Sequence, residues 1–243
     1  MRALLRLGLL LILSFLSLQL FFAGRIALMA VLAPESTTFE RSEMLRLARE
    51  DGRVLWSQQW MDESRISAQL KRAVIASEDA GFNDHGGVEW DAIEKAWERN
   101  QREQARAERR AERQGNAAKP AKVVGGSTIT QQLAKNLFLS GERTLARKGQ
   151  ELVLTFMLEA LLSKPRILEI YLNHVEWGEG VFGAQAAARH YFRVDAARLS
   201  AHQAARLAVM LPAPKRFEKR PNSPYVLGRA ATVVARMGAV DLP

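Results

Sequence analysis

Cysteine is absent from the 243-residue chain, which excludes disulfides and thiolate metal sites. A core of this size needs no disulfide to be stable, so the absence of cysteine does not distinguish an oxidising from a reducing compartment. Histidine is scarce, with four residues and no His-x-x-x-His or His-Glu-x-x-His spacing, and no zinc site of these kinds is predicted. The sequence also lacks a Gly-x-Ser-x-Gly nucleophile elbow, a phosphate-binding Gly-x-x-x-x-Gly-Lys loop and internal repeats.

Acidic residues are outnumbered by basic ones. The chain has 35 Lys and Arg against 26 Asp and Glu, a formal net charge of +9. Such a balance favours an anionic partner, which can be nucleic acid, phospholipid headgroups or a phosphorylated substrate. The compartment in which the protein resides decides among these three.

The N-terminal region contains a long apolar run, Leu7–Ala23, interrupted only by Ser14, Ser17 and Gln19. At about 1.5 Å per helical residue the run spans roughly 25 Å, close to the thickness of a bilayer core. A membrane anchor, a cleaved signal peptide and a buried helix are the three interpretations. No amphipathic period supports a buried helix, and the best small-x-small cleavage site, at residues 31–33, lies far downstream. We therefore predict a cytoplasmic tip and transmembrane anchor over residues 1–33.

The orientation of this anchor follows from its flanking charges. Arg2 and Arg6 precede the run, which predicts a cytoplasmic N-terminus and a single pass of the cell inner (cytoplasmic) membrane. The rest of the chain would then lie in the periplasm or outside the cell. Export by either an anchor or a signal peptide argues against nucleic acid as the partner.

The remaining chain divides into a segment without clear period and a helical region. Residues 34–63 read as a tether or short juxtamembrane subdomain, and residues 64–243 as the main domain, with Ser64 or Ser67 capping its first helix. No convincing hairpin or alternating strand is present, so the predicted fold class is mainly α. Helices are expected over residues 64–79, 88–100, 127–139, 142–163, 165–173, 183–191, 200–210 and 224–237.

A charged insertion occupies residues 99–122. It consists almost wholly of Arg, Glu, Gln and Ala before a flexible stretch from Gly115, and pairs such as Glu98 with Arg102 favour a solvated helical extension or a mobile segment. A basic patch for RNA fits less well, because acids are interleaved and aromatics are missing.

Glu78 is the first residue whose setting indicates chemistry. Its neighbours are small or apolar, and partial desolvation there would raise the pKa of its carboxyl toward the range useful to a general base or acid. A surface acid at a helix end is the alternative from these residues alone. Asp79 and His85 can serve as caps and hydrogen-bond partners.

A second polar group begins after Gly126, where Ser127 is a plausible N-cap. Thr128, Gln131, Gln132 and Lys135 recur at helical spacings and suit sugar hydroxyls and an anion. An N-capped surface helix is the alternative for any one of them. A surface helix would nevertheless prefer Glu, Lys and Ala to this run of hydroxyls and amides.

A third group forms one helical stripe. Arg143, Arg147 and Glu151 are spaced by four residues, with Lys148 beside them, and residues 152–162 continue almost wholly apolar. A salt-bridged exposed face is one explanation. The apolar continuation predicts that the far end of the helix is buried, and the stripe can then line a cleft and neutralise a leaving pyrophosphate.

These groups fall within five segments that together carry a resemblance. The segments are 78–86, 126–136, 147–151, 164–173 and 183–188 with Tyr191 and Phe192. They span about 115 residues in one order, and the likeness extends more loosely from about Thr38 to the C-terminus. The chain resembles the peptidoglycan glycosyltransferases of glycosyltransferase family 51, in particular the monofunctional, membrane-anchored biosynthetic transglycosylases.

The resemblance implies a lysozyme-like α-helical glycosyltransferase domain that polymerises lipid II. The growing glycan would pass from undecaprenyl pyrophosphate to the 4-hydroxyl of the next lipid II, with inversion. Glu78 resembles the general base and Glu151 the second acid, near the leaving pyrophosphate or a divalent cation. Cations matching donor-phosphate positions are Lys135, Arg143 and Lys148. The other matched substrate-site residues are Asp79, Phe82, His85, Thr128, Gln131, Gln132 and Asn136.

The same resemblance sets the expected cofactors and partners. No cofactor is strictly required, although some members use a divalent cation, Mg²⁺ or Mn²⁺. The partners are lipid II, the growing undecaprenyl-pyrophosphate-linked glycan, the membrane and wall-synthesis or division proteins, with no nucleic acid. A lytic transglycosylase or lysozyme-like hydrolase is one alternative function, and an inactive membrane scaffold of the wall-synthesis machinery is another.

Overall fold

The computed structural model describes residues 2–50, 52, 54–114, 126–139, 141–142 and 144–243. Its elements in chain order are α1 (Arg2–Leu28), α2 (Thr38–Glu50), β1 (Ser57–Gln58), the 3₁₀ turn η1 (Glu63–Arg65), α3 (Ala68–Glu78), α4 (Trp90–Gln114), α5 (Ile129–Phe138), α6 (Leu145–Leu161), α7 (Lys164–His174), β2 (Glu176–Gly178), β3 (Val181–Phe182), α8 (Gly183–Phe192), the 3₁₀ turn η2 (Ala196–Arg198), α9 (Ala201–Met210), α10 (Pro214–Phe217) and α11 (Pro224–Met237). The predicted mainly α class is confirmed.

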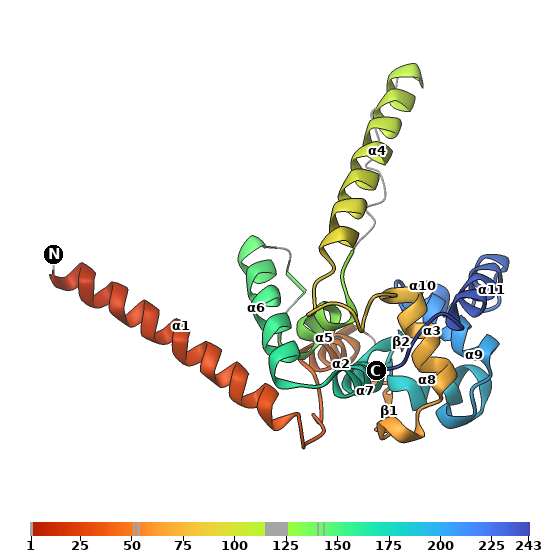
Figure 1. Ribbon diagram of the computed structural model, residues 1–243, viewed down its shortest axis with the longest axis horizontal. Coiled ribbons are helices and arrows are strands. Elements are labelled where there is room, and N and C mark those ends of the chain that lie inside the picture. Colours follow the sequence, from red (N-terminus) through yellow and green to blue (C-terminus); the bar gives the residue numbers. More distant parts are fainter. Residues whose placement is uncertain (1, 51, 53, 115–125, 140, 143) are drawn as a thin grey trace.

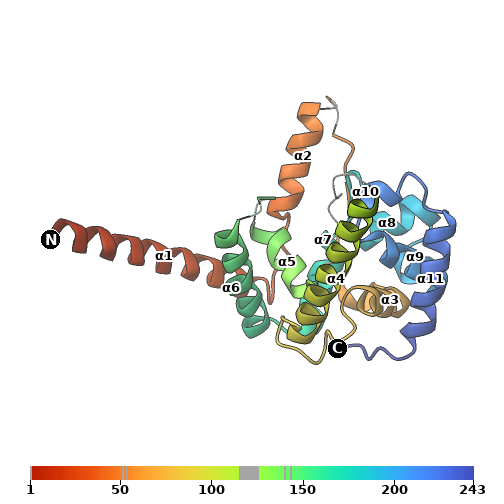
Figure 2. The ribbon, with the colours of Figure 1, turned by 90° about the horizontal axis from the view of Figure 1, so that it is seen from above.

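α1 leaves the body as a single long helix in both views (Figure 1, Figure 2). Among the described residues it is the one helix long and apolar enough to cross a membrane, and only 6% of its most apolar stretch is buried. A buried core helix would show the opposite, so this exposure fits the predicted anchor. Only Gln19 and Ile26 of α1 are buried, and both face the body.

The body consists of two helical groups. α3, α9 and α11 pack on one another, while α5 lies between α2, α6 and α7, and α8 packs on α7. The core runs continuously through both groups, and Leu70, Leu133 and Leu172 are essentially inaccessible within it. Trp177 is fully buried at the junction, where its indole N–H donates to the Leu207 carbonyl at 3.1 Å. Burial of these side chains supplies the apolar driving force that holds the cleft-bearing helices together.

The expectation of no strands is wrong in one place. A three-stranded sheet has the order β1-β3-β2, with β1 parallel and β2 antiparallel to β3. Strands of two or three residues are too short for an alternating pattern to be visible in sequence. Gly180 turns the β2–β3 hairpin at φ +70°, and a Cβ there would lie 1.9 Å from the Leu55 carbonyl oxygen, so only glycine fits.

The segment predicted as a tether carries packed structure. α2 contacts α5, and β1 pairs with β3. Glu40 of α2 is fully buried, and its carboxylate lies 2.8 Å from Nδ1 of His174 on α7. Gln58 of β1 donates to the same carboxylate at 2.9 Å. Because His174 lies 134 residues from Glu40 along the chain, no local period could predict this burial.

The helix starts match the sequence signals with one correction. Ser67 caps α3, and Pro165 lies in the first turn of α7, as expected. α5 is capped by Thr128 and not by Ser127. The Thr128 side chain accepts from the Gln131 N–H, and the Gln131 side chain accepts from the Thr128 N–H, which forms a capping box.

α4 agrees with the predicted solvated helical extension, whereas α6 is more exposed than its apolar stretch suggested. α4 runs as one helix to Gln114 and projects from the body, with the predicted Glu98–Arg102 pair at 2.8 Å (Figure 1). The prediction that the far end of α6 is buried is confirmed for one face, where Leu154, Leu158 and Leu162 are buried. It is wrong for the other face, since Phe156 and Leu161 remain 46% and 41% exposed.

Candidate active site

Glu78 is the last residue of α3 and faces a cleft beside α5. Its carboxylate accepts a hydrogen bond from the Gln132 side-chain amide at 3.0 Å, and the side-chain oxygen of Gln132 accepts from the Tyr171 hydroxyl at 2.9 Å. Burial raises the pKa of Glu78, the Gln132 hydrogen bond lowers it, and the nearby Asp79 charge raises it further. The carboxyl therefore holds a proton more readily than an exposed glutamate, as a general base requires.

Asp79 fastens the end of α3 to the start of α5. One carboxylate oxygen accepts from the Ile129 N–H at 2.9 Å, and the other lies 2.8 Å from Nε2 of His85. The Gly87 N–H donates to Nδ1 of His85, so Nε2 carries the proton that points at Asp79. Asp79 is 4% exposed, and its contacts set the position of Glu78.

Thr128 and Gln131 have most of their polar atoms engaged inside the protein. Besides the capping box, the Thr128 hydroxyl donates to the Gly87 carbonyl at 2.6 Å. Gly87 has φ +89°, and a Cβ there would lie 2.7 Å from Thr155. This glycine therefore lets the loop after α3 approach both α5 and α6.

Phe82 lies below the cleft and is fully buried. The Lys164 ammonium lies 4.5 Å from the Phe82 ring centroid and donates to the His85 carbonyl at 2.7 Å and to Glu159 at 2.9 Å. Lys164 lies in one of the five segments of the resemblance, 164–173, but was not among the predicted site residues. Its position just before Pro165 was the only local sign of a special role. The partners of Lys164 could not be predicted locally, because His85 comes from a distant segment.

A cavity of about 370 Å³ lies between α2, α5 and α6. Its lining includes the predicted residues Gln131, Gln132, Lys135, Asn136, Arg147, Lys148 and Glu151, together with Ser127 and residues of α2. Arg143, also predicted here, lies outside the described residues. The structure thus brings the amides of α5 and the cations of α6 to one hollow, as the sequence stripes predicted.

Glu151 holds the cations of this cavity in place. It is 4% exposed, accepts from Arg147 at 2.9 Å and pairs with Lys148. Lys135 faces the cavity, and desolvation lowers its pKa while the charge of Glu151 opposes that change. The lining holds the cations Lys135, Arg147 and Lys148 against the carboxylates Glu142 and Glu151, which leaves a positive excess suited to an anion such as a diphosphate.

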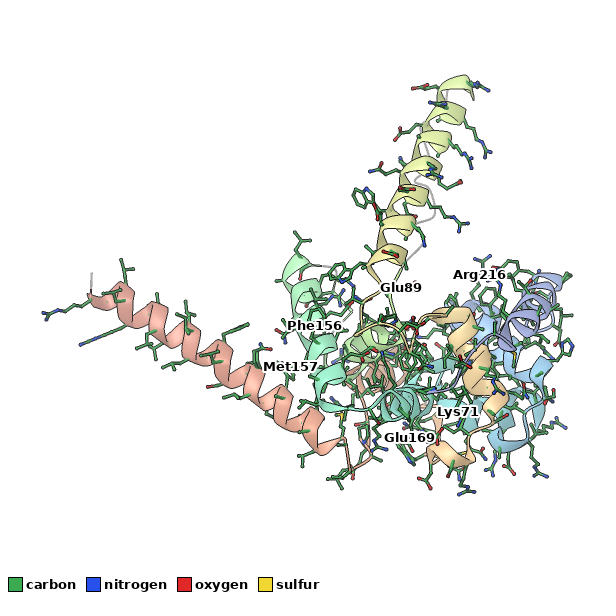
Figure 3. All side chains as sticks on the ribbon, viewed as in Figure 1. Lys71, Glu89, Phe156, Met157, Glu169 and Arg216 are labelled. Carbon is green, nitrogen blue, oxygen red and sulfur yellow. The ribbon has the colours of Figure 1, made fainter. Side chains whose placement is uncertain are left out.

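A second cavity of about 300 Å³ contains Glu78. Glu89, Lys95 and Arg99 line it together with residues 126–128, which precede α5, and Ser127 lines both cavities. Figure 3 places Glu89 at the base of α4. Glu89, Lys95 and Arg99 were not predicted as site residues, because the charged stretch that follows them has the composition of a solvated helix.

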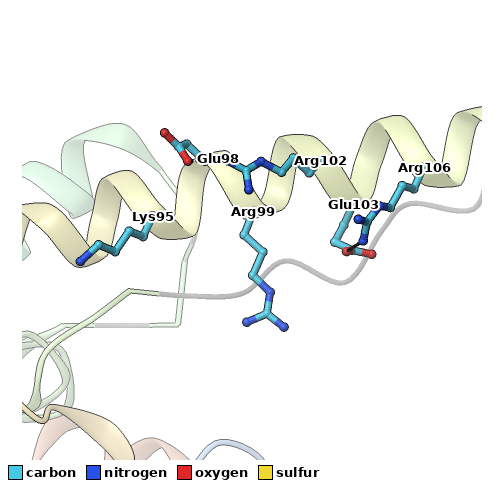
Figure 4. Close-up of a pocket in the computed structure, with 6 residues that line it drawn as sticks. All are labelled: Lys95, Glu98, Arg99, Arg102, Glu103 and Arg106. Carbon is cyan, nitrogen blue, oxygen red and sulfur yellow. Dashed lines mark hydrogen bonds and ion pairs between the residues drawn. The ribbon is translucent and has the colours of Figure 1, made fainter.

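α4 also borders an open hollow of about 440 Å³ farther from the body. Its described lining is Lys95, Glu98, Arg99, Arg102, Glu103 and Arg106, all from one helix (Figure 4). Within the described part of the chain no second element contributes a wall. We therefore assign the chemistry to the two cavities that meet at Ser127.

Neither position considered for a divalent cation has a suitable donor set. Both carboxylate oxygens of Glu151 are paired with Arg147 and Lys148, which occupy its lone pairs and repel a metal. Among the described residues Asp79, His85 and Glu89 have ligand atoms within 4.8 Å of one another. There the proton on His85 Nε2 and the Ile129 N–H already occupy Asp79. These residues do not fit Mg²⁺ or Mn²⁺.

Comparison with known proteins shows the family of the chain. A transglycosylase family model matches residues 46–238. A biosynthetic peptidoglycan transglycosylase of Bordetella pertussis is 52% identical over 225 residues, 93% of this chain and 88% of that one. Proteins of the same name from Burkholderia thailandensis and Paraburkholderia phytofirmans are 51% and 48% identical, over 95% and 98% of this chain and 84% and 92% of theirs. The chain therefore belongs to the transglycosylase family.

Proposed function

We propose that this transglycosylase is a peptidoglycan glycosyltransferase that polymerises lipid II into glycan strands. The observation that carries the proposal is the pair of cavities meeting at Ser127. One holds Glu78 with a raised pKa, and the other holds cations around Glu151. A transferase with a diphosphate leaving group needs both, whereas a hydrolase of finished glycan has no diphosphate to bind.

In the proposed reaction the Glu78 carboxylate takes the proton from the 4-hydroxyl of the acceptor lipid II. That oxygen attacks the anomeric carbon of the donor glycan, whose bond to undecaprenyl pyrophosphate breaks with inversion. Lys135, Arg147 and Lys148 stabilise the departing diphosphate, so no protonated acid is needed on that side. No divalent cation enters these steps.

The remaining predicted residues divide into two roles. Gln132 and Asn136 face the cation-lined cavity and contact the substrate there, with Gln132 also orienting Glu78. Five predicted substrate-site residues act chiefly by holding the loops around the site, as their internal bonds or burial support: Asp79, Phe82, His85, Thr128 and Gln131.

The protein is anchored in the inner membrane by α1, with its N-terminus in the cytoplasm and residues 38–243 in the periplasm. The exposed apolar surface of α1 and the arginines at positions 2 and 6 support this orientation. Wall-synthesis or division proteins are expected as further partners, since polymerised glycan must be cross-linked by other enzymes.

The test is incubation of the full-length protein with labelled lipid II in detergent, with wild type beside Glu78→Gln. A ladder of long glycan that is absent with the variant supports the proposal. Shortening of purified sacculi without polymer formation would indicate a hydrolase, and equal products from both proteins would indicate that Glu78 is not the base. Repeating the wild-type reaction with a chelator checks the metal requirement.

A further inference from the structure

The anchor helix contacts the catalytic body through a pair of glutamines. The side-chain amide of Gln150 on α6 donates to the side-chain oxygen of Gln19 at 3.0 Å, and the side-chain amide of Gln19 donates to the side-chain oxygen of Gln150 at 3.1 Å. Each amide thus satisfies a donor and an acceptor of the other. Gln19 is 9% exposed, in a helix whose other residues before Ile26 are exposed or half-buried.

The location of Gln19 makes this pairing costly to break. It lies within the apolar run that ends at Ala23, about 6 Å from that end at 1.5 Å per residue. At this depth a lipid tail offers no hydrogen-bond partner, so an unpaired amide on α1 would be unsatisfied. The pair therefore favours one axial register of α1 against α6.

Gln150 immediately precedes Glu151, the acid that organises the cations of the larger cavity. A displacement of α6 along α1 would move Arg147 and Lys148 by the same amount. Further contacts tie α1 to the same body: Phe22 packs edge-on to Phe138 of α5 at 5.3 Å. In Figure 3 two further residues of α6, Phe156 and Met157, lie on its side toward α1.

We propose that the Gln19–Gln150 pair is a positioning contact that sets the height of the cation-lined cavity above the bilayer. A lipid-linked diphosphate is held at a fixed depth by its own hydrocarbon chain. The cavity must therefore stand at the matching height for its cations to reach that diphosphate. This inference rests on the proposed function, because only a membrane-bound substrate makes the height matter.

The activity test compares wild type with Gln19→Leu/Gln150→Leu, which removes both amides and leaves none unpaired. Two assays are run: undecaprenyl lipid II in phosphatidylglycerol-containing vesicles, and a short-chain lipid II analogue in detergent. Since misplacement by about 1 Å can cost about 100-fold in rate, we expect a loss of about 10- to 100-fold in vesicles. In detergent, where depth is not imposed, the two proteins should differ by less than about threefold. Ser17→Leu, on the exposed side of α1, is the matched control and should match wild type in both.

Equal rates of wild type and the double Leu variant in vesicles would overturn the proposal. An equal loss of rate in vesicles and in detergent would also overturn it, because it would indicate a purely structural role for the glutamine pair. Wild type without polymer in either assay would refute the proposed function instead. The absence of native cysteine gives a separate readout. Oxidation in vesicles should cross-link Gln19→Cys/Gln150→Cys and not Ser17→Cys/Gln150→Cys, and failure of the first pair would refute the docking whatever the activity.

Discussion

Replacing Gln132 by Met tests the connection between the fold and the proposed base. Met keeps the length of the side chain and removes both of its polar groups. Two hydrogen bonds are lost together, the one donated to Glu78 and the one accepted from the buried Tyr171 hydroxyl. The first bears on reactivity and the second on stability, so the two effects can be measured separately.

The stability effect comes from Tyr171, which is 1% exposed. A buried hydroxyl left without a partner costs about 1–3 kcal/mol. For a protein of this size each kcal/mol corresponds to about 2–4 °C in Tm, so thermal denaturation should begin several degrees earlier. Gln132→Met/Tyr171→Phe removes the orphaned hydroxyl as well and should recover most of that loss.

The effect on reactivity is a change in pH dependence. Burial holds the pKa of Glu78 above its usual value, and the Gln132 hydrogen bond acts in the opposite direction. Removing that bond raises the pKa further. Because the carboxylate is the proposed base, the acid limb of the pH–rate profile should move to higher pH, and the rate deficit should shrink as the pH rises.

The assay is polymerisation of labelled lipid II across pH 5–9, with Tm measured at each pH. The double variant is the informative control, since it restores stability and still lacks the hydrogen bond to Glu78. Its acid limb should stay displaced. An acid limb that returns to the wild-type position in the double variant, or that never moves in the single one, would refute the argument.

Three further substitutions follow from the site. Glu78→Gln should reduce turnover by about 10²–10⁴-fold with substrate binding retained. Since the pKa of Glu78 is raised in the folded state, ionisation of its carboxyl lowers the stability of the wild type as the pH rises. The variant should therefore match the wild-type Tm at low pH and equal or exceed it at pH 7, and a lower Tm at pH 7 would contradict the assigned burial. Lys135→Ala would remove the proposed charge-assisted contact to the donor diphosphate and should raise the donor KM about 10- to 100-fold. Lys219→Ala, at an exposed lysine, is the control, and unchanged kinetics would exclude the phosphate role of Lys135. Thr128→Ala should lower stability by about 1–2 kcal/mol through loss of the cap and of the bond to Gly87, which urea unfolding would detect, whereas Thr128→Ser should be near neutral.

Local sequence patterns predicted most helices of this protein within a few residues. The α11 span 224–237 agrees at both ends, because a serine cap and a proline in the first turn mark its start. The pattern failed for β1, β2 and β3, because strands of two or three residues are too short to show an alternation and β1 pairs with a strand far along the chain. It also overestimated the burial of α6, since an apolar stretch does not reveal which neighbour covers it.

The residues of the candidate site also divide into those that local sequence could predict and those that it could not. Glu78 and the cations of α6 could be named from residue type and spacing, because each lies in a short motif with its own local chemistry. The roles of Asp79 and Gln132 could not. Asp79 bonds to Ile129, fifty residues away, and Gln132 bridges α3 to Tyr171 on α7.

By itself, then, the sequence determined most of the helices, the apolar N-terminal segment, the transglycosylase motifs and the candidate base, each of which depends on residue types and spacings within short segments. Only the tertiary structure decided that Thr128 caps α5, that Asp79 is enclosed, that two cavities meet at Ser127 and that Gln19 reaches Gln150. These features depend on contacts between residues distant in the chain. Such contacts exist only after the core has brought the helices together, and no local propensity encodes them.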